Sequence, residues 1–484
     1  MSEETKLPHP LVATLPVVVL IGLLAVVIFL FGSDSLSGGS QVALLMGTAV
    51  CVFVSMVFYR TSWRTFENQF MQTIGGASVT LLILLTVGMI AGSWMISGVV
   101  PTLIYYGVQI LSPKFFLFCT CIICSFVSLL SGSSWTTIAT IGVALMGIGQ
   151  ALGVSEAWTA GAIISGAYFG DKMSPLSDTT ILASSSTGTD LFTHIRYMIR
   201  TTIPTYTVTL LIFFVAGFLL SGSADVEVIA YTKGLSETFN ISLWTLVVPL
   251  LTGVLIARKV PSLITLFISA LMAGVTALVL QPHILQQIAG DDTLSLPKAL
   301  THGLAVTYYG STAIDTGNAS LNEFISTSGM SGMLDTIWLI LCAMCFGGGM
   351  TAGGMLESIT RMFTRFIKGR VSIVSSTVAS GLFLNICTAD QYISIILTGN
   401  MFKETYHDNG YEARLLSRTT EDAVTVTSPL IPWNTCGMTQ ATVMGVATWT
   451  YLPYAVFNYL CPVFSVIIAI TGYRIFKKHP SVED

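Results

Sequence analysis

The sequence predicts an all-α polytopic membrane protein. Hydrophobic residues occupy 53% of its 484 positions and charged residues only 10%, against roughly 25% charged residues in a typical soluble domain. Too few charges remain to cover a large water-facing surface. Many uncharged runs also approach or exceed the ~20 residues that a membrane-spanning helix requires. These observations exclude a soluble globular protein.

Composition excludes several functions as well. The formal charge of −4 leaves no basic surface for nucleic acid. The nine cysteines lie in apolar stretches, which is typical of reduced thiols inside a membrane rather than of disulfides. Cys119, Cys121 and Cys124 are close in sequence but have no histidine beside them, so we expect no zinc site. The absence of a G-x-x-x-x-G-K-[ST] loop argues against direct use of ATP.

The apolar segments predict helices in chain order. Residues 10–33 and 35–59 each predict one span, and the first is too long for the core of a signal peptide. Residues 68–113 and 115–155 are uncharged, and each run is long enough for two helices. Further apolar segments bring the total to about 10–14 membrane segments and cover residues 158–186, 203–221, 242–257, 262–281, 336–356, 371–387 and 449–471.

Two short stretches, 63–67 and 191–200, are amphipathic and predict helices in the membrane interface. The tract 283–335 is too polar to cross the membrane in contact with lipid, and one role for it is to line an outer vestibule.

Lysine and arginine residues indicate the orientation, because they collect in cytoplasmic loops. Basic residues mark four such loops and the C-terminus: Arg60, Arg64, Arg196, Arg200, Arg258, Lys259, Arg361, Arg365, Lys368, Arg370, Arg474, Lys477 and Lys478. The loops between them are mainly acidic and carry Asp225, Glu227, Glu237, Asp291, Asp292, Asp315, Glu323 and Asp335. Both termini are therefore expected in the cytoplasm.

This alternation requires residues 115–152 and 371–404 each to cross the membrane an even number of times. Each segment is therefore either two spans or one re-entrant hairpin. Polar clusters lie at their midpoints, at residues 131–136 and 385–390. Irregular backbone at membrane depth is tolerated only where it is buried in protein or lines a watery cavity. The polar tips therefore favour two hairpins that reach a transport site.

A short motif recurs at a fixed offset. The tripeptide Ser-Pro-Leu at 174–176 returns at 428–430, 254 residues later, and the same offset carries Ser131 onto Asn385. Each half contains five full spans in addition to its hairpin. Because five is odd, the second copy enters the membrane with the opposite orientation. The sequence thus predicts an inverted-repeat secondary transporter with a site near the midplane.

The predicted units follow from this repeat. Proline removes a backbone donor and breaks a helix, so Pro175, Pro429 and Pro432 predict two broken helices. The units are a first repeat (1–221) with hairpin 115–152 and broken helix 158–186, an acidic outer linker (222–241), a second repeat (242–473) with hairpin 371–404 and broken helix 420–445, and a cytoplasmic tail (474–484).

Asp178 is the foremost ion-binding candidate. It follows the break at Pro175 and stands beside Thr179 and Thr180. A carboxylate among hydroxyls and freed carbonyls is a hard-oxygen environment that suits a small cation. An acid at membrane depth is costly and indicates function by default. Such a group can hold either a proton or a cation, which is the minimal chemistry of exchange.

Other charged residues have a structural alternative beside the functional one. Asp171 and Lys172 are adjacent and cannot share a helical face, so they either serve the site or fix the broken helix through other ion pairs. Asp390 is the only charge near the second hairpin tip. Glu421 and Asp422 open a long uncharged run, where they either join the site or complement a helix dipole.

Several of these residues belong to longer motifs. Residues 166–180 (GAYFGDKMSPLSDTT) closely resemble the signature of the NhaC-type sodium/proton antiporter family. Glu421-Asp422 followed by residues 427–437 (TSPLIPWNTCG) also resembles it. With residues 131–136, the resemblance covers nearly the whole chain. Ala423 and Val424 depart mildly from the pattern, which has small or polar residues there.

The resemblance implies an antiporter of the bacterial inner membrane that exchanges Na⁺ for H⁺ by alternating access, with inverted repeats and paired hairpins. Asp178 would carry the exchangeable proton or Na⁺, and the Na⁺ ligands would be Asp178, Thr179, Asn434 and Thr435. Asp171 and Lys172 would form a charge pair that rearranges during access switching. The remaining site residues implied are Ser133, Ser134, Ser174, Ser177, Asn385, Thr388, Asp390, Asp422 and Ser428. No cofactor is expected beside the transported Na⁺ and H⁺.

Alternatives remain at this point. A subgroup of the family exchanges malate and protons for lactate and Na⁺, and Lys172 is then the only deep cation expected to balance a carboxylate. An intramembrane enzyme would need Ser131, Ser133 or Ser134 as nucleophile and a deep base, whereas all six histidines are expected near loops or interfaces. A non-enzyme is therefore favoured, although the residues are also compatible with a channel. Expected partners are membrane lipid, small ions and small carboxylates, and a homodimer is compatible with the sequence.

Overall fold

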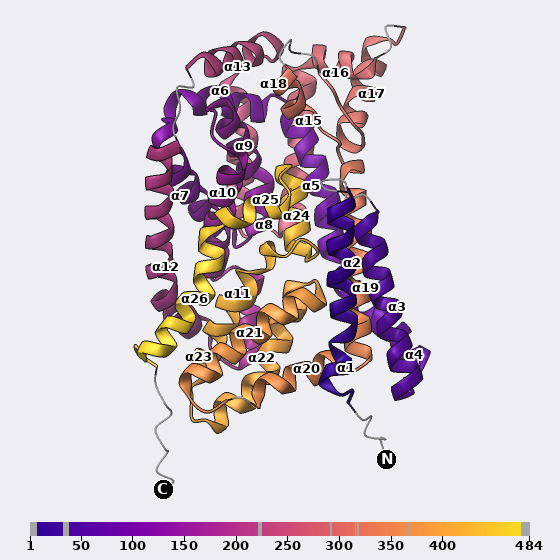
Figure 1. Cartoon of the computed structure of the whole chain (residues 1–484). Coiled ribbons are helices and arrows are strands. Elements are labelled where there is room, and N and C mark those ends of the chain that lie inside the picture. The colour runs from indigo at the N-terminus through magenta and orange to yellow at the C-terminus, as the bar shows by residue number, and fades with distance from the viewer. Residues whose placement is uncertain are drawn as a thin grey trace.

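A computed structural model describes residues 7–31, 38–220, 225–290, 293–314, 316, 319–365 and 367–475. These residues are almost entirely helical, and an isolated bridge between Thr312 and Thr327 is the only β pairing among them. Figure 1 shows helices in every layer of the molecule. The prediction of an all-α fold is confirmed.

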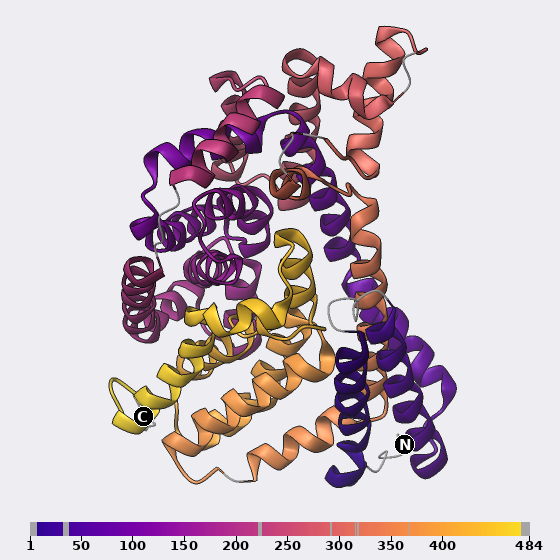
Figure 2. The ribbon, with the colours of Figure 1, turned by 45° about the horizontal axis from the view of Figure 1, so that its top comes forward.

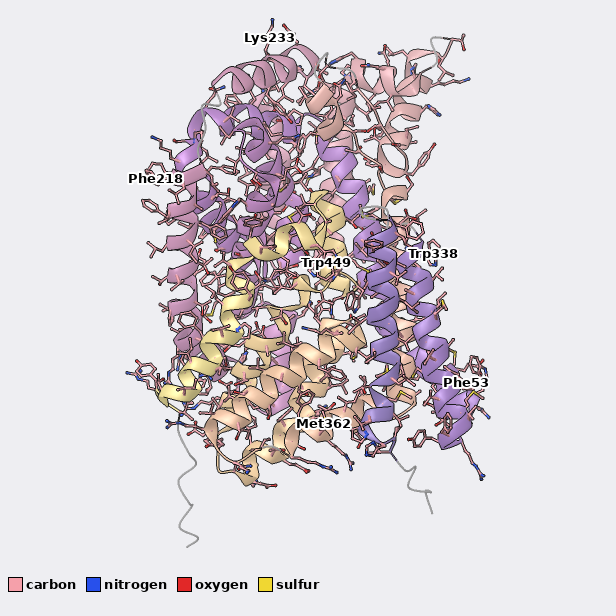
Figure 3. The ribbon with its side chains drawn as sticks, in the orientation of Figure 1. Phe53, Phe218, Lys233, Trp338, Met362 and Trp449 are labelled. Atoms are coloured by element: carbon pink, nitrogen blue, oxygen red, sulfur yellow. The ribbon has the colours of Figure 1, made fainter. Side chains whose placement is uncertain are left out.

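The helices of the described ranges include eight that are long and apolar enough to cross a membrane, or ten if each of two bent pairs counts as one span. The two bent pairs turn by 92° and by 55° at their breaks. Exposed apolar side chains such as Phe53, Phe218 and Trp338 project from the flanks of the molecule (Figure 3). A belt of this kind suits hydrocarbon rather than water. The chain is therefore a polytopic membrane protein.

One group of helices stands at one side of Figure 1 and consists of α1 (Pro10–Ala13), α2 (Leu15–Phe31), α3 (Gly39–Tyr59), α4 (Trp63–Gly76), α19 (Leu334–Ala352) and α20 (Met355–Thr364). Within it, α19 packs against α3 and α4, and α2 packs against α3. The first and the second half of the chain thus both contribute to this side.

A second group reaches the upper end of the molecule (Figure 2) and consists of α5 (Ser78–Ile96), α6 (Val99–Ile110), α13 (Asp225–Thr238), η3 (Leu243–Leu246), α14 (Val247–Ala257), α15 (Ser262–Leu280), α16 (Pro282–Ala289), α17 (Leu296–Tyr309), α18 (Ala319–Ile325) and η4 (Ser331–Met333). Its centre is α5, which packs against α15 and α17.

The remaining elements form the two hairpins and the two broken helices. From the first half come α7 (Pro113–Ser131), α8 (Ser134–Thr137), η2 (Ile138–Gly142), α9 (Val143–Ala151), α10 (Glu156–Met173), α11 (Asp178–Thr187) and α12 (Leu191–Leu220). From the second half come α21 (Arg370–Thr388), α22 (Gln391–Asp408), α23 (Ala413–Thr420), η5 (Glu421–Thr425), η6 (Ser428–Leu430), α24 (Thr435–Met444), α25 (Thr448–Tyr451), η7 (Leu452–Tyr454) and α26 (Val456–Thr471).

The two helical hairpins lie toward opposite ends of the molecule. Their first helices, α7 and α21, are both among the eight helices of the described ranges that are long enough to cross a membrane, so the choice between re-entrant hairpins and paired spans remains open to test. In Figure 1, α7 and α9 lie in the upper half, whereas α21 and α22 lie in the lower half. Gly132 ends α7 with φ +67°, and a Cβ there would lie 2.7 Å from the carbonyl carbon of Leu176, so the first tip requires glycine. Asp390 begins α22 by accepting a 3.0 Å hydrogen bond from the backbone N–H of Ile393. Both tips come at the predicted polar clusters.

The two broken helices run in opposite directions past each other. In Figure 1, α10 lies above α11, whereas α23 lies below α24. The first break covers residues 174–177, and the second passes through the π-helical η5 and the 3₁₀ turn η6 before α24 begins. This antiparallel arrangement agrees with the inverted-repeat fold class. The domain boundaries drawn from the repeat remain predictions.

One predicted element is wrong. Residues 191–200 are not a separate interfacial helix, because they continue without interruption into α12, a helix of 30 residues. His194 and Tyr197 are buried there, and α12 packs against α23. Helix α23 covers one face of this stretch, whereas Phe192, Arg196 and Ile199 on its other face are exposed. The other amphipathic stretch, 63–67, opens α4 with Trp63 exposed and Phe66 buried.

The described chain begins and ends at the lower end of Figure 1, with α1 and with the last turn of α26. The acidic helix α13 lies at the upper end, where Figure 3 shows Lys233. Some predictions fall outside the described residues, namely those on 1–6, on 222–224 of the linker, on 476–484 of the tail with Lys477 and Lys478, and on Asp291, Asp292 and Asp315.

Candidate functional site

A cavity of about 410 Å³ lies where the first hairpin tip meets the first helix break. Its wall also includes α5, the connection between α14 and α15, and the start of α22. The polar lining is Thr80, Ser131, Ser133, Thr136, Asp171, Ser177, Asp178, Thr179, Lys259, Ser262, Thr265, Gln391 and Tyr392. Cavities of this size accommodate small ligands in many proteins.

Asp171 fastens the hairpin tip to the break. Its Oδ2 accepts hydrogen bonds from the backbone N–H of Ser134 (3.1 Å) and from the Ser134 hydroxyl (2.6 Å). Its Oδ1 accepts a 2.5 Å bond from the hydroxyl of Ser177. The Ser134 N–H is free because α8 begins there, with Ser133 as its N-cap. Asp171 is only 4% exposed and lines the cavity.

Ser174 holds the break itself. Its hydroxyl donates to the carbonyl of Leu129 on α7 (2.8 Å) and accepts from the N–H of Leu176 (3.2 Å). Ser131 and Ser133 bond within the hairpin tip. The hydroxyl of Ser134 donates to the carboxylate of Asp171 and not to a histidine.

Asp178 is on the cavity wall, as the sequence predicts, but it is less enclosed than expected. It is the first residue of α11, and its side chain is exposed rather than enclosed in low dielectric. The turn at Pro175 directs Thr179 and Thr180 inward instead, and both are buried. The deep acids of the site are other residues.

Lys172 pairs across the molecule rather than with Asp171. Its ammonium group forms an ion pair with Oδ1 of Asp422 on η5, and both side chains are fully buried. The ammonium also lies 3.0 Å from the sulfur of Cys461. Asp422 Oδ1 accepts a further bond from the hydroxyl of Thr201 (3.2 Å). The expected charge pair between adjacent residues is thus wrong, because neighbours on a helix point in different directions.

Two further deep residues belong to the site: Glu421, for which the sequence left a site role and a helix-dipole role open, and Arg418, which the sequence analysis missed. Glu421 is fully buried, and its Oε1 accepts a 3.2 Å hydrogen bond from the hydroxyl of Thr179. Arg418 is also fully buried, with Nε 3.6 Å from Oδ2 of Asp422 and its guanidinium 5.2 Å from the ring centroid of Tyr197. Lys172 is therefore not the only deep cation. The spacing of four residues between Arg418 and Asp422 is the signal that could have revealed the pair.

A histidine is also deeper than expected. His194 is fully buried, and its Nδ1 lies 2.9 Å from the hydroxyl of Ser417. His194 follows the connection before α12 closely, as expected for a histidine near a loop, but its side chain is enclosed by protein.

The second hairpin tip is fastened to the second break in a similar way. Asn385 donates from Nδ2 to the carbonyl of Val424 (2.7 Å), and Asn434 donates from Nδ2 to the carbonyl of Asn385 (3.1 Å). The N–H of Thr435 donates to the carbonyl of Ala389 (2.8 Å). Each tip is therefore bonded to its own broken helix.

Asp390 and Thr388 belong to this second assembly. The hydroxyl of Thr435 lies 3.4 Å from Oδ2 of Asp390, and Thr388 exchanges a 2.7 Å hydrogen bond with Ser394. Asp390 and Thr388 line a separate cavity of about 320 Å³. Tyr392 lines both this cavity and the larger one.

The four expected Na⁺ ligands divide between the two assemblies, and their coordination of one ion stays a prediction. Asn434 and Thr435 bond to the second hairpin, whereas Thr179 bonds to Glu421 and Ser177. Within the described ranges, no hydrogen bond joins Asp178 or Thr179 to either of them. Ser428 bonds through its hydroxyl to Oε1 of Gln391 (3.1 Å). The structure brings Asp171, Ser177 and Thr179 together with Glu421 instead.

A third cavity, of about 400 Å³, lies toward the upper end. Its wall includes Phe324, Ser326 and Thr327 from the polar tract 283–335, which therefore contributes to a vestibule. Along α5, Ile83 lines the large central cavity and Val87 lines this upper one. Four residues of α-helix rise about 6 Å, so only a thin layer of protein separates the two.

Comparisons with known proteins identify relatives of this chain. The model of the Na⁺/H⁺ antiporter family matches residues 166–473. The Na⁺/H⁺ antiporter NhaC of Alkalihalophilus pseudofirmus is 35% identical over 432 residues, which cover 89% of this chain and 90% of the relative. The malate-2H⁺/Na⁺-lactate antiporter of Bacillus subtilis is 36% identical over 413 residues, 85% of each chain.

Among solved structures, MtrF of Neisseria gonorrhoeae aligns over 96% of this chain and 95% of its own, with 15% identity and a TM-score of 0.35. The family match and the two relatives confirm the resemblance that the motifs at 166–180 and 427–437 carry. The chain belongs to the Na⁺/H⁺ antiporter family.

Proposed function

We propose that this chain is a secondary antiporter that exchanges Na⁺ for H⁺ across the bacterial inner membrane. The observation that carries the proposal is the position of Asp171. This buried carboxylate lines the central cavity and is bonded at once to the first hairpin tip and to the first helix break. An ion that binds there acts directly on the two elements whose movement would change access.

The cavity wall has the chemistry for a small cation. Asp171 and Asp178 supply negative charge, and Ser177 and Thr179 supply neutral oxygens. Hard cations prefer oxygen ligands of this kind. Asp178, exposed on the wall, would attract a cation from water, and Asp171 would receive it at the buried end.

Alternating access is supported by two cavities that α5 lines at successive heights, the central one at Ile83 and the upper one at Val87. Leu84, which is fully buried, lies between Ile83 and Val87 and forms part of the separating layer. The π-helix η2 lies between Trp135 and Thr136, which line the central cavity, and Val143, which lines the upper one. A short shift of these segments would close one cavity and open the other.

The basic lower end is proposed to face the cytoplasm. Arg60, Arg361, Arg370 and Arg474 belong to elements at that end, and basic loops remain on the cytoplasmic side. Both ends of the described chain lie there too, so both termini would be cytoplasmic.

An organic-acid antiporter is the second candidate, and Lys259 favours it. Its side chain lines the central cavity, whose volume of about 410 Å³ would hold a small dicarboxylate. Lys172 is not suited to that role, because Asp422 already neutralises it in a fully buried pair. In this reading, Lys259 would provide the charge that faces the substrate.

Transport by purified protein in sealed vesicles tests the proposal. We expect an imposed Na⁺ gradient to drive opposed proton movement without ATP, malate or lactate. Proton movement that requires malate on one side and lactate on the other would favour the organic-acid antiporter. No coupled movement in either arm would contradict both functions.

A further inference from the structure

Glu421 is the buried acid whose charge is least compensated by its neighbours. It lies in the π-helical turn η5 and is fully buried. Its Oε1 accepts one hydrogen bond, from Thr179, and its Oε2 has no partner among the described residues. A buried, unpaired carboxylate oxygen costs free energy unless it holds a proton or faces a cation. Such an atom points to a ligand.

A chain of hydroxyl groups joins Glu421 to the cavity wall. The hydroxyl of Thr179 bonds to Glu421 at 3.2 Å and to the hydroxyl of Ser177 at 2.9 Å. Ser177 in turn donates to Asp171 at 2.5 Å. Hydroxyls both donate and accept. The same groups can therefore pass a proton or provide oxygen ligands to a cation.

The charges of this cluster do not balance. Its five ionisable side chains, all at most 4% exposed, are Lys172, Arg418, Asp171, Glu421 and Asp422. With every group ionised, two positive charges face three negative charges. One proton or one Na⁺ would therefore bring the buried cluster to neutrality, which low dielectric strongly favours.

The hydrogen bonds indicate which acid takes the proton. Asp422 is next to both cations, Lys172 and Arg418, so its negative charge is compensated. Asp171 accepts three hydrogen bonds, which stabilise its ionised form. Glu421 has neither a cation in direct contact nor more than one donor among the described residues.

We propose that Glu421 carries the exchanged proton and that Na⁺, when bound, lies between Glu421 and Asp171. The proton that Glu421 releases leaves through Thr179 and Ser177 to the water of the central cavity, and Na⁺ takes its place as the balancing charge. This inference rests on the proposed Na⁺/H⁺ exchange and identifies the residue that holds the proton. At this cluster, one proton is exchanged for each Na⁺.

The charged and titratable groups around Glu421 influence whether it holds a proton. Helix α10 contributes Asp171 and Lys172, α23 contributes Arg418, α26 contributes Cys461, and η5 itself contributes Asp422. Helix α11 also packs against η5 and begins with Asp178 on the cavity wall. On the side of α21 and α22, Asp390 at the hairpin tip bonds to Ile393 and Thr435 instead.

Proton release by the purified protein tests the inference. In weakly buffered detergent solution, addition of Na⁺ should release protons from the unmodified protein. Glu421→Gln mimics the protonated acid and should abolish this release, whereas Glu404→Gln, at an exposed position on α22, should leave it unchanged. Glu421→Asp keeps the charge and should retain release at a higher Na⁺ concentration. Release of wild-type size from folded Glu421→Gln would overturn the inference.

An infrared difference spectrum of the unmodified protein tests the role of Glu421 without relying on variants that fold. Addition of Na⁺ should remove one protonated-carboxyl signal, and an unchanged signal would overturn the assignment. Different results would contradict the proposed Na⁺/H⁺ exchange and the proposed role of Glu421. Wild-type vesicles that show no Na⁺-driven proton movement would contradict the proposed function. Active wild-type vesicles matched by active Glu421→Gln vesicles would contradict only the role of Glu421.

Discussion

The ammonium group of Lys172 and the carboxylate of Asp422 form an ion pair across the centre of the molecule, 250 residues apart in the chain. Lys172 lies at the end of α10, before the first break, and Asp422 lies in η5, where the second break begins. The pair therefore joins the two broken helices where they pass each other. Its removal should affect both stability and access switching.

Breaking this pair should destabilise the protein strongly. Asp422→Asn leaves a buried ammonium group without its counter-charge, and Lys172→Met leaves a buried carboxylate. Each single change should cost about 3–5 kcal/mol of unfolding free energy. Thermal unfolding in detergent would measure the loss as a fall in Tm.

The exposed pair between Arg361 and Glu357 provides the matched control. Arg361→Met should cost no more than about 1 kcal/mol, because exposed ion pairs contribute little. The double variant Lys172→Met/Asp422→Leu, which removes both charges, should be more stable than either single variant. Equal and small effects of all these changes would refute a structural role for the buried pair.

The two acids of the cavity should respond differently to neutralisation. Asp171→Asn removes the charge that three donors stabilise, which should cost about 1.5–3 kcal/mol for each charge-assisted bond lost. We expect a lower Tm and no Na⁺-driven proton flux. Asp178→Asn, at an exposed position, should keep the Tm and raise the Na⁺ concentration that gives half-maximal flux.

Flux measured over a range of Na⁺ concentrations, together with Tm, separates these outcomes. Complete loss of exchange in a fully stable Asp178→Asn variant would show that the exposed acid, not the buried one, is the essential carboxylate. It would thereby support the assignment made from the sequence over the one made from the geometry.

The first hairpin tip should not tolerate a side chain at Gly132. Its φ of +67° costs a residue other than glycine about 1–2 kcal/mol. An alanine Cβ would also lie 2.7 Å from the carbonyl carbon of Leu176 and push the tip away from the break. Gly132→Ala should therefore lower both the Tm and the exchange rate.

Gly75→Ala is the matched control for Gly132→Ala, since a Cβ at Gly75 meets nothing within 4 Å. Alanine favours helix, so this change in α4 should be neutral or slightly stabilising. If Gly132→Ala exchanged Na⁺ as fast as Gly75→Ala and unfolded at the same temperature, the close approach of tip and break would be irrelevant to transport.

Asp190, which precedes α12, predicts a pH-dependent contribution to stability. The backbone N–H of Thr193 donates to its carboxylate at 2.9 Å and lowers the pKa of that group. Because the folded pKa lies below the unfolded one, the contribution is present above the unfolded pKa and is lost as pH falls through the folded pKa. Asp190→Ala should therefore reduce Tm at neutral pH.

The difference in Tm between the wild type and Asp190→Ala, followed from neutral pH down to about pH 3, tests this prediction. The difference should shrink in acid, as the wild type loses the advantage of its ionised carboxylate. A difference that stays constant or grows in acid would contradict it.

Residue patterns predicted the architecture well because membrane segments obey simple physical rules. Uncharged length predicted spans, and the matching Ser-Pro-Leu tripeptides at 174–176 and 428–430 predicted two helix breaks. The breaks and the polar hairpin tips are present, and Asp171 lies at the centre of the first assembly. Each of these signals depends on residues close together in the chain.

Contacts between the halves could not be predicted from the same signals. No pattern within a short stretch of sequence predicts that Thr179 contacts Glu421, 242 positions away, or that Lys172 contacts Asp422. The exposure of a side chain also depends on its direction around the helix. Asp178 is exposed on the cavity wall, whereas its neighbour Thr179 is buried. His194 was underestimated because residues 191–200 have the pattern of an interfacial segment, and Arg418 was not singled out because its burial depends on contacts with distant parts of the chain.

The central claim is that one proton and one Na⁺ are alternative occupants of the same buried acids. The apparent affinity of the purified protein for radioactive Na⁺, measured at a series of pH values, tests it most directly. Competition predicts an affinity that weakens about tenfold for each pH unit on the acidic side of the titration and reaches a plateau on the alkaline side. An affinity that stays the same across the whole pH range would contradict the claim.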